Sequence, residues 1–279
     1  MIAHSQFIAP FLLIDAGNTF IKWALNEADS AYFAQQGRFA QWHVRRATSV
    51  SAEPDWSDAP APGSVWISNV AGECSAQRIE TLIRARWPGV PYHAVRAQAS
   101  QCGVHNGYRE PPQLGSDRWA SLIGARAAWP DESVLIAALG TAMTLDLLDA
   151  NGYFAGGLIA PGGYLMMEAL GRHTALLPTI TPEDQDACAT HADADARARF
   201  ATDTQSALRA GCRLAQAALI ERVWQAARQR LNAPVRCVLS GGGAARMRPL
   251  LRMDTTYCEH LVLLGLARIA QADGAAAML

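Results

Sequence analysis

Two short segments of the sequence combine a glycine with small polar residues in a way that suits phosphate binding. The first reads Asp15-Ala-Gly-Asn-Thr-Phe-Ile-Lys22, and the second contains Gly140-Thr141. Each lies between two apolar runs, a pattern that predicts two β-strands joined by a tight turn. The backbone N–H groups and polar side chains of such turns can form a concavity that binds anions. The contributing residues are Gly17, Asn18, Thr19, Lys22 and Thr141. Two such turns predict a site for a polyphosphate.

A second group of candidate residues, Asp117 and Arg118, stands at the start of an expected helix. Phosphoryl transfer needs one carboxylate near the attacking hydroxyl. The helix dipole and Arg118 are expected to keep Asp117 ionised, so that it can accept a proton. Arg118 suits a carboxylate ligand, which a guanidinium binds through two hydrogen bonds. In the structural alternatives, Ser116 or Asp117 only caps the helix and Arg118 only pairs with Asp117.

The elements that must position these residues alternate between strands and helices, which predicts an α/β fold. Residues 11–25 align with residues 134–148, which indicates two duplicated halves. Further strands are expected at 64–70, 92–95, 153–159 and 235–239, and helices at 75–87, 116–129, 164–170, 204–231 and from 261 onward. A boundary at Pro130 predicts an N-terminal domain over residues 1–129 and a C-terminal domain over 130–279.

Composition excludes several classes of protein. The net charge of −1 over 279 residues gives no electrostatic reason to expect nucleic acid or an anionic membrane as partner. The apolar run 7–14 lacks a preceding cationic segment, so a cytoplasmic location is expected. No C-x-x-C pair occurs among the six cysteines, and neither His173 nor the segment with His191, Asp193 and Asp195 has metal-ligand spacing. No G-x-G-x-x-G motif indicates a dinucleotide-binding fold.

Five segments, in order, resemble type III pantothenate kinase: 15–22, 106–108, 114–118, 140–142 and 156–162. The resemblance extends from residue 11 to about residue 266. It implies two duplicated actin-like (ribonuclease H-like) domains, ATP in the cleft between them, and a homodimer. It also implies phosphorylation of pantothenate to 4′-phosphopantothenate, the first step of coenzyme A biosynthesis, with Mg²⁺ and a monovalent cation such as K⁺ or NH₄⁺.

The resemblance also assigns roles to residues. It makes Asp117 the catalytic proton acceptor and gives the pantothenate site to Tyr108, Gly115, Ser116, Asp117, Arg118 and Thr204. It assigns ATP binding to Asp15, Gly17, Asn18, Thr19, Lys22 and Thr141, with Asp15 contacting the metal through water. Each position has a structural alternative: Asp15 or Thr204 as a backbone cap, Lys22 as a solvated strand lysine, Thr141 as a turn residue, and Tyr108 as a cover of the core.

One position departs from the family pattern. An aspartate that helps to hold the monovalent cation usually stands two residues before Gly140, where this chain has Ala138. Either a backbone carbonyl or Asp146 holds the cation in place of this aspartate, or the enzyme lacks the K⁺ requirement. Two other classes also stay open: an actin-like kinase for another hydroxylated or carboxylate acceptor, and a non-catalytic regulatory protein of the same fold. The presence of Asp15, Asp117 and Arg118 disfavours the second.

Overall fold

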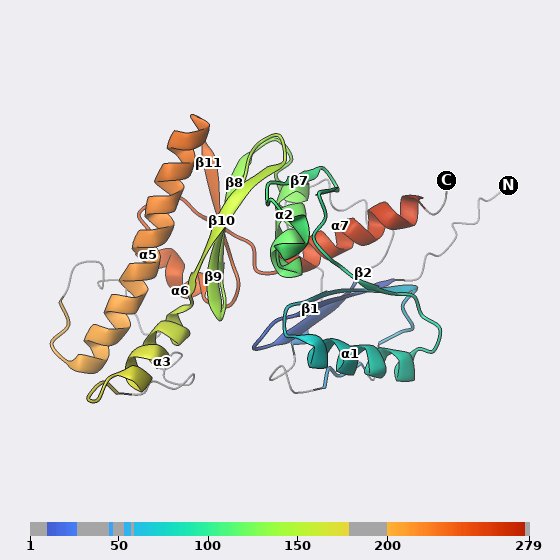
Figure 1. Cartoon of the computed structure of the whole chain (residues 1–279), viewed down its shortest axis with the longest axis horizontal. Helices are drawn as coiled ribbons and strands as arrows, with labels where there is room; N and C mark the ends of the chain where they lie inside the picture. Colours follow the sequence, from blue (N-terminus) through green and yellow to red (C-terminus); the bar gives the residue numbers. More distant parts are fainter. Residues whose placement is uncertain (1–9, 27–44, 47–52, 57–58, 179–199, 277–279) are drawn as a thin grey trace. The chain divides into compact units, whose positions relative to one another are not determined.

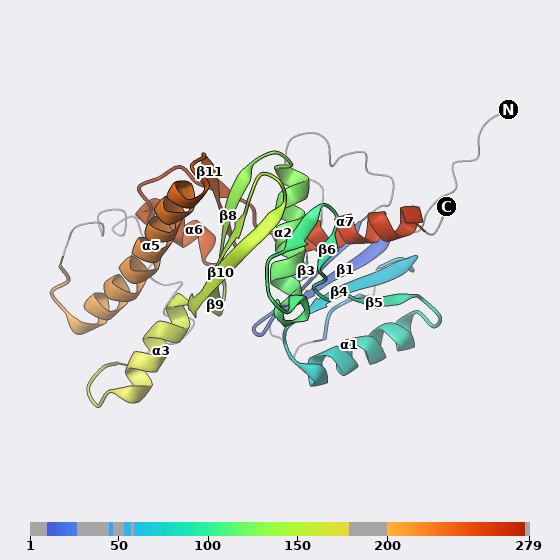
Figure 2. The same cartoon turned by 45° about the horizontal axis from the view of Figure 1, so that its top comes forward.

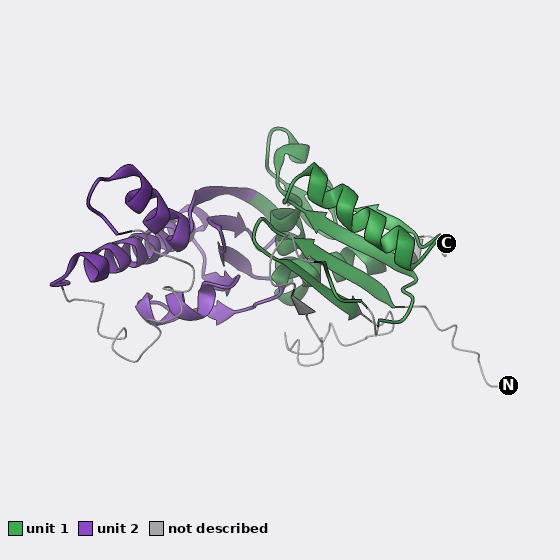
Figure 3. Ribbon diagram, turned by 90° about the horizontal axis from the view of Figure 1, so that it is seen from below, with its two compact units in different colours: residues 1–130, 152–154, 261–279 green, residues 131–151, 155–260 purple. Residues whose placement is uncertain are grey.

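The chain forms two compact units. A computed structural model (Figure 1) describes residues 10–26, 45–46, 53–56, 59–178 and 200–276. Unit 1 comprises residues 1–130, 152–154 and 261–279, and unit 2 comprises 131–151 and 155–260 (Figure 3). None of the helices within the described ranges has the length and apolar character that a bilayer span requires.

Unit 1 is built on a five-stranded sheet with the order β3-β2-β1-β4-β5. Its strands are β1 (Phe11–Ala16), β2 (Ile21–Asn26), β3 (Arg45–Arg46), β4 (Ser64–Asn69) and β5 (Tyr92–Ala94). β1 and β2 form the predicted antiparallel hairpin, whereas β4 runs parallel to β1 and β5 runs parallel to β4. Because parallel strands need a crossover, helix α1 (Glu73–Arg86) connects β4 to β5.

Alternate residues of β1 face opposite sides of this sheet. Leu12 and Ile14 join Ile79 and Ile83 of α1 in one buried cluster. The opposite face, which carries Asp15, packs against α2 (Ser116–Ala128) and α7 (Leu261–Ala276), as Figure 2 shows. The sheet of unit 1 is therefore covered on both faces, with the polar residue of β1 at the edge where α2 begins.

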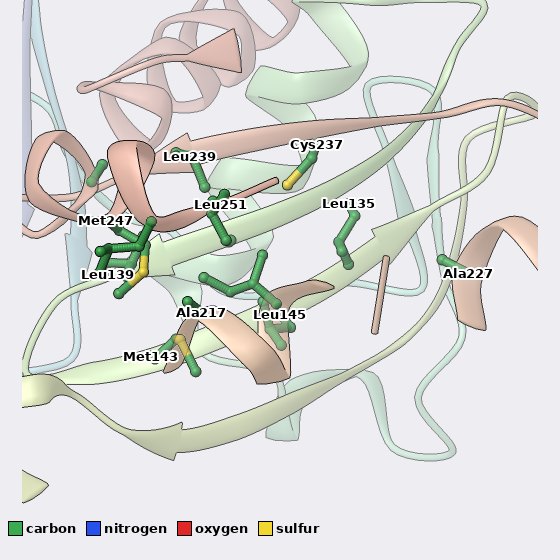
Figure 4. Close-up of a cluster of buried hydrophobic side chains, with 14 of the residues drawn as sticks. Leu135, Leu139, Met143, Leu145, Ala217, Ala227, Cys237, Leu239, Met247 and Leu251 are labelled. Atoms are coloured by element: carbon green, nitrogen blue, oxygen red, sulfur yellow. The ribbon is translucent and has the colours of Figure 1, made fainter. Parts of the chain in front are cut away.

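Unit 2 contains the second hairpin. Its strands are β8 (Ser133–Leu139), β9 (Ala142–Leu148), β10 (Tyr153–Pro161), β11 (Val235–Ser240) and β12 (Thr256–Tyr257), and its helices are α3 (Gly163–His173), α5 (Thr204–Leu231) and the short α6 (Ala244–Met247). Residues of β8, β9, β11, α5 and α6 form one apolar core (Figure 4). β10 begins in unit 1, where Tyr153 and Phe154 pair with β7 (Val104–Asn106), and β7 in turn pairs with β6 (Ser100–Gln101).

The strand orders confirm the predicted duplication. The order β3-β2-β1-β4-β5 in unit 1 repeats as β10-β9-β8-β11-β12 in unit 2. In each, the hairpin is antiparallel and the next two strands run parallel beside its first strand. The α/β class and most of the expected helices and strands are also confirmed, within a few residues at their ends.

The C-terminal helix differs from the predicted domain division. We expected residues 130–279 to form one domain, but α7 belongs to unit 1. It packs against α2, where Gly265 faces the backbone of Ala120 so closely that a β-carbon would overlap the Ala120 carbonyl oxygen. Gly124 of α2 likewise approaches the backbone of Leu261. Glycines at the contact let the two helix backbones approach, which sequence periodicity alone does not reveal.

Candidate active site

The carboxylate of Asp15 lies at the carboxyl end of β1. Its register partners are Lys22 on β2 and Ser68 on β4, and register partners share one face of a sheet. Burial raises the pKa of Asp15 to about 6, while the Lys22 charge lowers this pKa and the Asp117 charge raises it. Asp15 and Asp117 are therefore close enough to repel each other.

Asp117 is the second residue of α2. The alternative that Ser116 or Asp117 caps this helix is therefore wrong. The N-cap of α2 is Gly115, and neither Ser116 nor Asp117 caps the helix. The Asp117 Oδ1 atom instead accepts a hydrogen bond of 2.8 Å from the backbone N–H of Arg118. A β-carbon on Gly115 would lie 2.7 Å from this Oδ1. The absence of a side chain at position 115 therefore leaves room for the carboxylate.

Burial adds a contribution to the electrostatics of Asp117 that the sequence did not indicate. We expected the helix terminus and Arg118 to dominate and to favour the charged form. Burial instead raises the pKa of Asp117, and the hydrogen bond from Arg118 and its charge only partly oppose this. Removal from water outweighs the favourable contacts. A carboxylate with a raised pKa is a stronger base than one in water.

The guanidinium of Arg118 lies among aromatic side chains. Arg118 is buried, and its Nη1 donates a hydrogen bond of 2.9 Å to the Tyr108 hydroxyl. Its Cζ lies 5.6 Å from the ring centre of Tyr108 and 5.9 Å from that of Phe154. Because a guanidinium has five N–H donors, it can hold Tyr108 and still have donors for a carboxylate. Arg118 is therefore fixed by contacts beyond the ion pair with Asp117 that we considered.

Sequence analysis missed Phe154. This residue is fully buried at the start of β10, and its ring centre lies 5.4 Å from that of Tyr108. An apolar residue within a strand gives no signal that separates a neighbour of Arg118 from ordinary core. The adjacent Asn106-Gly107 is more informative in retrospect, because a β-carbon at Gly107 would overlap the Phe154 carbonyl oxygen.

The turn that carries Tyr108 is held by Asn106. Its Oδ1 accepts a hydrogen bond from the Tyr108 N–H at 3.0 Å, and its Nδ2 donates to the Pro111 carbonyl at 3.3 Å. The 3-10 turn η2 (Pro111–Gln113) follows and leads to α2. The segment 106–118 is therefore a fixed connection that brings Tyr108 back to Arg118.

The first hairpin turn differs in detail from the expected anion site. The N–H of Gly17 donates to the Phe20 carbonyl at 3.1 Å, so this group closes the turn and does not point outward. The side chains of Asn18 and Thr19 are exposed at its tip. Lys22 stands opposite Asp15 in the register of the hairpin. The structure thus groups Asp15, Lys22, Tyr108, Arg118 and the start of α2 within unit 1.

Thr141 belongs to unit 2, where three glycine-containing turns meet. Gly140 and Thr141 join β8 to β9, and the Thr141 carbonyl accepts a hydrogen bond of 2.9 Å from Gly162 before α3. Gly243, which follows β11, donates to the Leu139 carbonyl at 3.0 Å. Gly241 has a positive φ of 84° and would place a β-carbon 2.6 Å from the same oxygen. Glycine N–H groups therefore hold the carbonyl groups on either side of this turn, while Thr141 itself is exposed.

The cation position, Ala138, lies on the face of β8 opposite the apolar core. Its cross-strand partner is Thr144, and Asp146 stands two residues further along β9 on the same face. Asp146 is buried. Its place in the sheet agrees with the alternative that it replaces the missing aspartate.

The remaining candidates lie at other places. Thr204 is the exposed first residue of α5, and Asp203 is the cap, accepting a hydrogen bond of 2.9 Å from Ser206 N–H. His173 ends α3 and is exposed. His191, Asp193 and Asp195 fall outside the described residues. The described parts of the chain contain no cluster of acidic, cysteine or histidine side chains able to bind a metal ion.

Known proteins with similar sequences share one description. The sequence profile of type III pantothenate kinase matches residues 11–226. The type III pantothenate kinase of Burkholderia mallei (strain SAVP1) is 55% identical to this chain, over 93% of this chain and 98% of the relative. That of Burkholderia vietnamiensis (strain G4 / LMG 22486) is 53% identical, over 96% and 98%.

Solved structures show the fold. A protein from Sinorhizobium meliloti described as a 2-dehydro-3-deoxygalactonokinase has a TM-score of 0.55 at 17% identity, covering 94% of this chain and 99% of its own. A protein from Campylobacter jejuni described as a Baf family transcriptional activator has a TM-score of 0.50 at 15% identity, covering 95% and 99%. The fold is that of the actin-like ATPases, as the resemblance implied.

The raised pKa of Asp15 predicts a pH-dependent stability. Because the folded protein holds this proton up to about pH 6 and the unfolded chain releases it near pH 4, stability should fall as pH rises between these values. Asp15→Asn removes the titration. Urea unfolding should therefore show the variant more stable than wild type by up to about 3 kcal/mol at pH 7, and by much less at pH 4.

A matched control, Asp203→Asn, should change stability at pH 7 in the opposite direction. Hydrogen bonds from Ser206 lower the pKa of the exposed Asp203, so its charged form stabilises the fold above the unfolded pKa. Asp203→Asn keeps a capping side chain but should be less stable than wild type at pH 7. An effect of Asp15→Asn that is the same at both pH values would contradict the burial of its charge.

Proposed function

This chain belongs to the type III pantothenate kinase family, and we propose that it transfers the γ-phosphoryl group of ATP to the primary hydroxyl of pantothenate. The product is 4′-phosphopantothenate, in the first step of coenzyme A biosynthesis. One observation within unit 1 supports this reaction most directly. A carboxylate with a raised pKa, Asp117, is adjacent in sequence to a buried arginine held by Tyr108.

In this proposal, Asp117 acts as the general base. Its carboxylate accepts the proton of the pantothenate hydroxyl, whose oxygen forms a bond to the γ-phosphorus. The bond between this phosphorus and the bridging oxygen breaks, and ADP leaves. Arg118 binds the pantothenate carboxylate, which fits its fork of N–H donors. The family resemblance also assigns Tyr108, Gly115 and Ser116 of unit 1, and Thr204 of unit 2, to pantothenate binding.

The nucleotide is assigned to the two hairpin turns. The family resemblance assigns Gly17, Asn18, Thr19 and Lys22 of the first turn, and Thr141 of the second turn, to ATP binding. Asp15 fits the Mg²⁺ that accompanies ATP, because its charge is crowded by Asp117 and oxygen ligands suit this ion. When bound, Mg²⁺ neutralises phosphate charge. Asp15 would hold it through water.

The site proposal leads to a test at position 117. Asp117→Asn keeps the acceptor for the Arg118 N–H but cannot take a proton, so kcat should fall roughly 10²- to 10⁴-fold with little change in stability. A coupled assay with ATP, Mg²⁺ and pantothenate measures this, with sugars and other hydroxyl compounds as competing acceptors. Asp131→Asn, an exposed residue of unit 2, is the control and should keep wild-type kcat. Near-normal kcat in folded Asp117→Asn would refute the role, and turnover of a different acceptor would refute the substrate.

We also propose a weak dependence on K⁺ or NH₄⁺. Ala138 removes the carboxylate of the usual cation site, and Asp146 on the same face is its candidate replacement. Ala138→Asp should therefore increase activation by K⁺, measured against choline chloride at equal ionic strength. Ala138→Asn has nearly the same shape without the charge and should not. Strong and equal activation of all three proteins would contradict the proposal.

A cytoplasmic homodimer completes the proposed function. Large apolar side chains are exposed on three elements of unit 2: Leu158 and Ile159 of β10, Leu165 and Leu170 of α3, and Leu214 of α5. Helix α5, which is rich in alanine and leucine, is one plausible interface element. Its apolar residues Leu208, Cys212 and Ile220 are buried within unit 2, so β10 and α3 offer more exposed apolar area than α5.

If the exposed apolar side chains of β10 and α3 form the dimer interface, a charge introduced among them should disrupt the dimer. Ile159 is 66% exposed, and a carboxylate there costs little in a monomer but much in an apolar interface. Ile159→Glu should shift the protein from dimer to monomer in light scattering and lower its activity, whereas Ile159→Val should do neither. A wild-type protein that is monomeric and fully active would refute the dimer.

A further inference from the structure

Two buried serines link the strand beside Asp15 to the helix that carries Asp117. The Oγ atoms of Ser68 and Ser116 lie 2.9 Å apart, and the pair joins the end of β4 to the first residue of α2. Ser68 has no exposed surface, and Ser116 is 9% exposed. These residues are separated by 48 positions in the sequence, so the contact exists only in the folded chain.

The hydrogen bonds form a short chain. The Ser116 hydroxyl also donates to the Asn69 carbonyl at 3.4 Å. Since a hydroxyl has one proton, both contacts are satisfied when Ser68 donates to Ser116 and Ser116 donates to Asn69. The N-cap of α2, Gly115, has no side chain to hold the helix terminus. The serine pair therefore attaches the first turn of α2 to the sheet.

Each serine of this pair is a neighbour of one of the two carboxylates. Ser68 is the register partner of Asp15 on the neighbouring parallel strand, and Ser116 directly precedes Asp117. The Asp117 carboxylate has little freedom of its own, because its Oδ1 is bound by the Arg118 N–H and lies close to Gly115. Once the first turn of α2 is fixed, the position of this carboxylate is fixed as well.

We infer that Ser68 and Ser116 are positioning residues that set the place of the Asp117 carboxylate relative to Asp15. The inference rests on the proposed function for its kinetic consequence. A buried hydroxyl pair with a purely structural role would affect stability alone. A positioning role also affects turnover, because a small displacement of a general base from the reacting hydroxyl lowers the rate steeply.

The kinetic test uses Ser116→Ala, Ser68→Ala and the double variant. Each should lower kcat with pantothenate about tenfold or more, with KM for ATP within about twofold of wild type. Because both serines act through one contact, the double variant should lose no more than either single variant. Ser116→Thr keeps the hydroxyl and should restore activity. Ser121→Ala, on the same helix more than one turn further along, is the matched control and should keep wild-type kcat.

A second readout does not depend on the substrate. Exchange of backbone N–H groups with D2O reports on the first turn of α2 in the protein without ligands. In Ser116→Ala this turn is released from β4, so the Arg118 N–H, which is bound to Asp117 Oδ1, should exchange faster than in wild type, whereas N–H groups in the middle of α2 should keep their rates. If wild type fails to phosphorylate pantothenate, the proposed function fails and this exchange rate alone decides the inference.

Three results would overturn the positioning role. They are wild-type kcat in folded Ser116→Ala, losses in the single variants that multiply in the double variant, and an unchanged exchange rate of the Arg118 N–H in Ser116→Ala. If Ser116→Ala does not fold, the same measurements are made on Ser68→Ala, which leaves the sequence of α2 unchanged.

Discussion

The parallel pairing of β1 with β4 is the constraint from which the arrangement of unit 1 follows. It places Asp15 beside Ser68 at the carboxyl ends of the two strands, where the start of α2 meets the sheet. α2 and α7 cover this face and remove Asp15 and Asp117 from water, so that two like charges lie near each other in a poorly hydrated place. The covering helices can approach closely because glycines occur at their contact.

Two carboxylates placed so close together destabilise the folded protein. The arrangement is useful only if a positive charge balances them during the reaction. Burial raises the pKa of both carboxyl groups, which makes each carboxylate a stronger base and a better partner for a cation. A kinase brings its own compensation, since a nucleotide carries Mg²⁺ into the site. The cost of holding two carboxylates in the free protein is typical of sites that trade stability for activity.

The neighbouring arginine is held by a different kind of contact. Tyr108 and Phe154 surround the guanidinium of Arg118 with a hydroxyl and two aromatic rings. Phe154 of β10 pairs with Asn106 of β7, and the next residue, Gly107, lies so close to the Phe154 carbonyl oxygen that a β-carbon would overlap it. This pairing explains why residues 152–154 belong to unit 1 although the chain on either side of them belongs to unit 2.

The sequence by itself determined the features that depend on local pattern. Apolar runs around Gly17 and Gly140 defined both hairpins, and helical spacing located α5 from Thr204 to Leu231. The order of the motifs also identified the family and the candidate residues. Only the tertiary structure decided which residues meet across long separations and how much water they keep. It assigned α7 to unit 1, made Gly115 the cap of α2, and joined Ser68 to Ser116. It also determined that burial raises the pKa of Asp117, because desolvation depends on what covers a carboxyl group, and the covering helices come from distant parts of the chain.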